Sequence, residues 1–111
     1  MPAHAAVENL YRARLLTQRA ELLQTQGDIQ KLTSGDRVKR GAAQLAHLEA
    51  AALLDAIEAR LLSVNRALGR LEEGRFGLCV ECGDTLPTER LEARPDAHLC
   101  VPCCERWRQT S

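Results

Sequence analysis

The sequence predicts a mainly α-helical protein: an antiparallel helical hairpin (a coiled coil) followed by a small four-cysteine zinc-finger unit with a short C-terminal helix. Three observations lead to this prediction. No proline interrupts Ala3 to Leu86, a heptad pattern fills the second half of that stretch, and two Cys-x-x-Cys pairs follow it. We therefore place the helical hairpin at residues 1–74, with its tip near 33–41, and the four-cysteine zinc finger at 75–111.

The first helix is predicted from about Ala5 to Thr33. Leu15, Leu22 and Ile29 are spaced by sevens, as expected for one face of a paired helix. The segment Thr33-Ser34-Gly35-Asp36 then combines a helix stop with a plausible N-cap for the next helix. Because so short a link joins neighbouring helices, the pair should run antiparallel.

The second helix has the clearer pattern. Its apolar positions alternate steps of four and three residues, which is a heptad seam. The seam consists of Ala43, His47, Ala50, Leu54, Ile57, Leu61, Val64, Leu68 and Leu71. Pairing with the first helix explains most of this pattern, and His47 is expected to be a partly buried, hydrogen-bonded residue and not a ligand.

The two cysteine pairs predict a metal site. Cys79 and Cys82 form the first pair, Cys100 and Cys103 the second, with 17 residues between the pairs. Two such pairs are typical of a tetrahedral zinc site in which all four ligands are thiolates. Since four protein ligands leave no open position for a substrate, the single Zn²⁺ should be structural.

The residues around the cysteines support the metal interpretation. Gly83 directly follows Cys82, where a tight knuckle favours a positive φ. Pro102 suits the first turn of a short helix that continues through Trp107. Cys104 is left over from the two pairs; it is expected to be a bystander, although a thiol at a helix start can also oxidise or exchange onto zinc.

Composition excludes several classes of protein. Lys plus Arg and Asp plus Glu number 15 each, and aromatic residues make up only 3%, which argues against direct nucleic-acid binding. The sequence predicts no membrane helix and no signal peptide, so zinc-bound thiolates point to the cytoplasm. It contains no catalytic constellation, so we predict no enzymatic activity and expect a monomer.

The zinc region resembles a known family. The strings Gly74-Arg75-Phe76-Gly77-Leu78-Cys79 and Arg90-Leu91-Glu92-Ala93-Arg94-Pro95, each tied to a cysteine pair, resemble the DksA/TraR family of bacterial zinc-finger transcription regulators. The resemblance implies that the chain binds RNA polymerase, that the tip of its coiled coil enters the secondary channel, and that zinc fixes the base of the rod.

The resemblance also assigns a partner-binding tip. An ungapped match places the family's tip motif on Asp36-Arg37-Val38-Lys39-Arg40-Gly41, where Asp36 is retained but the second aspartate is Lys39 and the alanine is Gly41. The same match puts Ala56 and Ser63 where nucleotide-binding members carry basic residues, which argues against binding of guanosine tetraphosphate.

Two other functions remain open at this point. The chain could be a zinc-ribbon adaptor that binds another protein and uses the hairpin only as a handle. It could also be a thiol redox sensor that uses one of the cysteine pairs.

Overall fold

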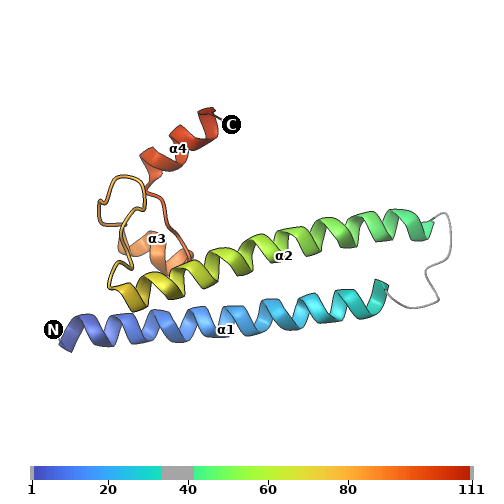
Figure 1. The fold of residues 1–111 in the computed structure, drawn as a ribbon, viewed down its shortest axis with the longest axis horizontal. Coiled ribbons are helices and arrows are strands. Elements are labelled where there is room, and N and C mark those ends of the chain that lie inside the picture. Colours follow the sequence, from blue (N-terminus) through green and yellow to red (C-terminus); the bar gives the residue numbers. More distant parts are fainter. Residues whose placement is uncertain (1, 34–41, 111) are drawn as a thin grey trace.

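The computed structural model describes residues 2–33 and 42–110, with the side chains of 6–33 and 46–109. These ranges contain four helices: α1 (Pro2–Thr33), α2 (Ala42–Glu73), α3 (Thr88–Ala93) and α4 (Val101–Thr110). α1 and α2 lie side by side as an antiparallel hairpin, and the segment with α3 and α4 lies beside the C-terminal end of α2 (Figure 1). The chain is elongated, with extents of 57 × 34 × 21 Å. The predicted fold class is confirmed.

The seam between α1 and α2 is buried at one end of the hairpin only. Leu15, Val64 and Ala67 are fully buried, and Leu71 is nearly so. Farther along α2 the seam positions are half-buried, and His47 is exposed. The expectation that His47 is partly buried is therefore wrong, because among the described residues α1 does not cover this position of α2.

The C-terminal end of α2 has a regular cap. Gly74, at φ +74°, donates its N–H to Leu71 O at 3.3 Å, and Arg75 donates to Arg70 O at 2.8 Å. This pair of bonds is the Schellman motif, in which a residue with positive φ satisfies the last carbonyls of a helix. The motif ends the helix and turns the chain toward the cysteines.

A second apolar cluster joins the hairpin to the cysteine region. It contains Tyr11 of α1 together with Cys79, Leu86, Leu91 and Cys103. Phe76 packs against both this cluster and the hairpin core, and its ring centroid lies 5.3 Å from that of Tyr11. Because the clusters share Phe76, the core continues from the hairpin into the cysteine region.

Asp96 provides a polar junction between the same two parts. Its side chain is 1% exposed, and Oδ2 lies 3.1 Å from Arg60 Nε on α2 and 3.3 Å from Arg94 Nη2. With the side-chain amide of Gln18 on α1 oriented so that its oxygen faces Arg60, that oxygen accepts a hydrogen bond from Arg60 Nη2 at 2.6 Å. Arg60 therefore links α1, α2 and the loop before Cys100.

Short backbone contacts complete the fold. In the described part of the chain, β pairing is limited to an isolated antiparallel bridge between Leu78 and Thr85. No helix in the described ranges is both long enough and apolar enough to cross a membrane.

Candidate metal centre

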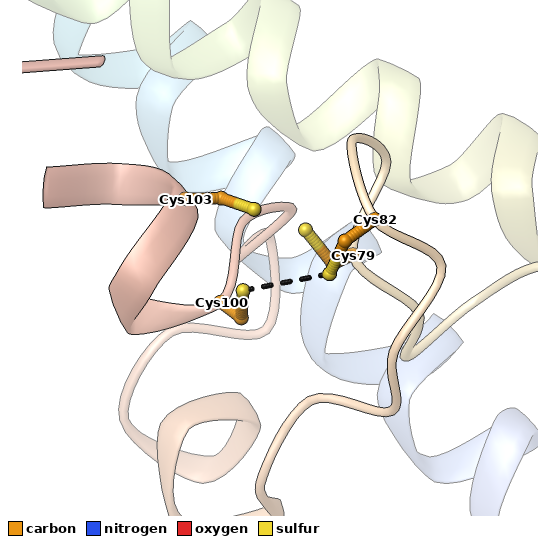
Figure 2. A group of neighbouring side chains, drawn as sticks. All are labelled: Cys79, Cys82, Cys100 and Cys103. Carbon is orange, nitrogen blue, oxygen red and sulfur yellow. Dashed lines mark hydrogen bonds between the residues drawn. The ribbon is translucent and has the colours of Figure 1, made fainter. Parts of the chain in front are cut away.

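The structure brings the four predicted cysteine ligands together. The Sγ atoms of Cys79, Cys82, Cys100 and Cys103 all lie within 4.8 Å of one another. Cys79 and Cys82 come from the loop after α2, Cys100 precedes α4, and Cys103 lies in its first turn; their sulfurs converge on one point (Figure 2). Cys104 is not a member of this group.

The arrangement fits a tetrahedral zinc ion. With Zn–S bonds of about 2.3 Å, the sulfurs of a regular tetrahedron lie about 3.8 Å apart. The Cys82 and Cys100 sulfurs, which belong to different pairs, lie 3.7 Å apart. A disulfide would need about 2.05 Å. A donor set of four thiols around one point therefore suits one Zn²⁺ held by four protein ligands, which is a structural ion.

Backbone hydrogen bonds build the two cysteine knuckles in the same way. Gly83 N donates to Cys79 O, and Cys104 N donates to Cys100 O, both at 2.9 Å. Gly83 has φ +79°, which confirms the positive φ predicted for it. Val80 N also donates to His98 O at 2.9 Å, so a direct backbone bond joins the first knuckle to the segment before the second.

The thiols have unequal tendencies to ionise. Burial opposes the Cys79 thiolate, but the amides of Cys82, Cys100 and Glu81 outweigh it and lower the pKa of Cys79 to about 6. The amide of Asp84 favours the Cys82 thiolate, yet burial and the three neighbouring thiols raise its pKa to about 12. The cluster thus accepts a first negative charge readily and resists further ones, as expected for a site that needs a divalent cation.

Two arginines support the second pair. Arg106 of α4 donates from Nη2 to Cys103 Sγ at 3.1 Å. Arg90 of α3 donates from Nε to Leu99 O at 2.9 Å, next to Cys100. The hydrogen bond to Cys103 is also the main cause that raises the pKa of Arg106. The guanidinium therefore remains a cation beside a ligand sulfur.

The structure gives different results for the other predicted site residues. The tip, Asp36 to Gly41, lies outside the described residues, so its role stays a prediction. Cys104 is half-buried in the first turn of α4, and its role as a bystander also stays a prediction.

Several supporting features were not predicted from the sequence. The short helix α3 is one: Pro87 precedes it, and Arg94, before Pro95, ends it in an extended conformation. These two prolines could have indicated a bracketed helix. The three-residue spacing from Cys103 to Arg106 could have indicated that their side chains meet on α4. The contacts of Asp96 and Tyr11 join residues far apart in the sequence, and no local pattern signals them.

Comparison with known proteins places this centre in a family. Residues 74–106 match the prokaryotic dksA/traR C4-type zinc finger. The Escherichia coli RNA polymerase-binding transcription factor DksA is 42% identical over 40 residues, 36% of this chain. The matched segment is only 26% of that protein's length. An uncharacterized Aquifex aeolicus protein is 29% identical over 104 residues, covering 90% of this chain and 70% of that protein.

The likeness in three dimensions is more extensive. The structure of transcription factor DksA2 from Pseudomonas aeruginosa matches with a TM-score of 0.77 and 28% identity, covering 95% of this chain and 85% of that one. The match therefore includes the hairpin as well as the cysteine region. Together the zinc-finger match and the shared fold confirm the resemblance: residues 74–106 match a zinc finger of the dksA/traR C4 type, and the fold of the chain is similar to that of DksA2.

Proposed function

We propose that this chain is a non-enzymatic transcription regulator that binds RNA polymerase. In this proposal the helical hairpin enters the secondary channel, and the zinc centre fixes the base of the hairpin. The observation that supports it most is the fold match with DksA2, because it covers 95% of the chain and so includes both parts. The E. coli relative that matches the zinc region is named as an RNA polymerase-binding factor.

The shape of the hairpin suits this role. Each of its two helices has 32 residues, which at about 1.5 Å per residue gives a rod of about 48 Å. The rod is only two helices wide and projects from the cysteine region (Figure 1). A projecting rod of this kind can reach into a channel that a compact domain could not enter.

Side-chain contacts attach the base of the hairpin to the cysteine region. Tyr11 of α1 packs in the cysteine cluster, and Asp96 is paired with Arg60 on α2. Both helices are therefore attached to the zinc unit by side chains. Zinc binding would stabilise the base and, through these contacts, the direction of the rod.

The tip determines what the rod would do inside the channel. Its sequence has Arg37, Lys39 and Arg40 against a single carboxylate, Asp36. A basic tip would be attracted to carboxylates and metal-bound phosphates at a catalytic centre. Because basic residues are replaced at Ala56 and Ser63, we expect this activity to be independent of guanosine tetraphosphate.

The test is equilibrium binding of the zinc-loaded chain to core RNA polymerase. A tip variant with Arg37, Lys39 and Arg40 changed to glutamine should bind at least about tenfold more weakly, because each contact to a charged group contributes about 1.5–3 kcal/mol. Asp36→Ala tests the retained carboxylate. The control is Arg12→Gln with Arg14→Gln and Arg19→Gln, which removes the same charge from α1 and should bind as the wild type does.

Competition and metal content separate the alternatives. A known secondary-channel factor should displace the chain from polymerase. Binding without displacement, or with no effect of the tip variant, would favour an adaptor that docks elsewhere. No binding by the zinc-loaded wild type at low salt would refute the proposal. A thiol redox sensor would instead form a disulfide and release zinc under mild oxidant.

A further inference from the structure

Arg106 makes a contact that neither the zinc-finger match nor the proposed function explains. Its Nη2 donates to Cys103 Sγ at 3.1 Å, and it lies three residues after that cysteine on α4. A guanidinium bound to a thiolate forms a charge-assisted hydrogen bond, which is stronger than one between neutral groups. The contact therefore adds a positive charge directly beside one ligand of the zinc ion.

The charge of the centre gives this contact a physical role. Four thiolates and one Zn²⁺ carry a formal charge of −2. Cys79 and Cys103 are each only 2% exposed, so water screens their sulfurs poorly. A buried charge that is not compensated is costly. Nearby donors and cations must therefore offset the charge.

The two cysteine pairs obtain this compensation from different sources. In the first pair, backbone amides favour both thiolates: those of Cys82, Cys100 and Glu81 at Cys79, and that of Asp84 at Cys82. At Cys103 the stabilising group from outside the cluster is the Arg106 side chain. The compensation that reaches Cys103 from outside the cluster is therefore a side chain of α4.

We propose that Arg106 is a positioning residue of the zinc centre, which compensates the charge of the Cys103 thiolate and thereby increases the retention of zinc. It does not ligate the metal. This role extends beyond polymerase binding and holds whether or not the chain binds polymerase. Outer contacts of this kind, when removed, commonly weaken metal binding by about 10–100-fold.

The surroundings of Arg106 suggest a second consequence. A cavity of about 390 Å³ is lined by Glu81, Cys82, Cys103, Arg106 and Trp107. Arg106 and its acceptor Cys103 both belong to the wall of this cavity, although the Cys103 side chain itself is nearly buried. A hydrogen bond to the sulfur withdraws electron density, so the Cys103 thiolate should be a weaker nucleophile than it would be without Arg106.

The experiment measures zinc affinity by competition with a chromophoric chelator. Arg106→Gln should bind zinc about tenfold more weakly than the wild type. Arg106→Lys keeps the charge but not the planar guanidinium, so its zinc affinity should lie between those of the wild type and Arg106→Gln. Arg19→Gln removes the same charge from α1, far along the sequence from the centre, and should leave the affinity unchanged.

A spectroscopic measurement distinguishes compensation from simple packing. In the Co²⁺-substituted protein, the sulfur-to-cobalt charge-transfer band should move to lower energy in Arg106→Gln, because the sulfur electrons lose a nearby positive charge. Arg19→Gln should not move it. Weaker binding without a band shift would mean that Arg106 only packs α4, and affinity within twofold of wild type would also overturn the proposal. If Arg106→Gln fails to fold, Arg106→Met decides, because it removes the charge but keeps an apolar stem on α4: its band should also shift, and an unshifted band with full affinity would refute the compensation.

Discussion

The two ends of the helical hairpin have the same heptad pattern but different packing. At the base, Leu15 and Val64 are fully buried. Toward the opposite end, the seam residues Ile29, Ala50 and Leu54 are only half-buried, and His47 is exposed. At the base, Phe76 packs against the seam from a third side, whereas the residues that the structure describes at the other end belong to α1 and α2 alone. Because most helix stability comes from tertiary packing, we expect the end that packs against the cysteine region to be the more stable one.

Loss of a zinc ligand should have the largest effect and should act almost entirely at the base. Cys79→Ser removes a buried ligand, and the centre should no longer retain zinc. The cluster around Tyr11 should then loosen while most of the helical content of α1 and α2 remains. Metal analysis, near-ultraviolet circular dichroism of the aromatic residues and far-ultraviolet circular dichroism check these results.

Cys104→Ser is the matched control for that variant. It changes a cysteine on the same helix as Cys103 but outside the sulfur group. It should retain zinc and the aromatic signal. Equal zinc loss in both variants would mean that Cys104 is a ligand and that the assignment of the centre is incomplete.

Truncation of two seam residues of α1, one in the fully buried part of the seam and one near the far end, tests the comparison directly. Leu15→Ala leaves a cavity in a fully buried site and should lower the free energy of unfolding by about 2–5 kcal/mol. Ile29→Ala changes a half-buried seam residue and should cost only about 1 kcal/mol. Urea unfolding of the zinc-loaded variants measures both. Equal losses would show that the two ends are packed alike.

The Asp96 junction should contribute less than the apolar core. Asp96→Asn removes a buried carboxylate from Arg60 and Arg94 and should cost about 1–3 kcal/mol, a value kept modest because Arg60 is one-third exposed. Urea unfolding of the zinc-loaded protein gives the value. Glu58→Gln, an exposed carboxylate on α2, is the control and should change little.

The stability lost in Asp96→Asn should depend on pH in a way that follows from the charge of Asp96. Burial opposes its ionisation, but the hydrogen bond with Ser63 and the charges of Arg60 and Arg94 outweigh burial and lower the pKa of Asp96. Because folding lowers the pKa of Asp96, its carboxylate stabilises the folded protein at pH values above the unfolded-state pKa of about 3.9. This stabilisation is lost as the pH falls through the lower pKa that Asp96 has in the folded state. The difference between wild type and Asp96→Asn should therefore be constant from about pH 8 to pH 5. A difference that shrinks already between pH 7 and 6 would contradict an ionised Asp96.

Two glycine substitutions should give the smallest effects, with opposite signs. Gly27→Ala lies inside α1 with open space around a new Cβ, so it should stabilise the protein by about 0.5–1 kcal/mol. Gly83→Ala also meets no atoms, but φ +79° strains an L residue, so it should destabilise by about 1 kcal/mol. Thermal unfolding with zinc present measures both, and a stabilising Gly83→Ala would contradict the left-handed knuckle.

The sequence was sufficient to predict the parts that depend on local pattern. The heptads of α2, the cysteine pairs and the positive φ of Gly83 all follow from spacing or from one residue's conformational freedom. The extent to which the seam is buried could not be predicted, because a heptad indicates which face pairs but not what covers it. His47 shows this difference: its position fits the seam, yet its side chain is exposed.

The supporting contacts of the centre were harder to predict for a related reason. Asp96 meets Arg60 across 36 positions, and Tyr11 meets the cysteine cluster from the other end of the chain. Such pairs depend on how α2, α3 and the loops are placed relative to one another. The contact of Arg106 with Cys103 is local, but its importance becomes apparent only once the four sulfurs are known to converge.

The attachment of Tyr11 and Arg60 to the zinc unit makes the hairpin a lever with its pivot at the metal. Over the roughly 33 Å of helix from Tyr11 to Thr33, a rotation of about 5° at the pivot displaces the far end by about 3 Å. A displacement of that size is comparable to the length of a hydrogen bond. A subtle rearrangement among the cysteines would therefore be amplified into a movement large enough to make or break contacts at the remote end of the arm.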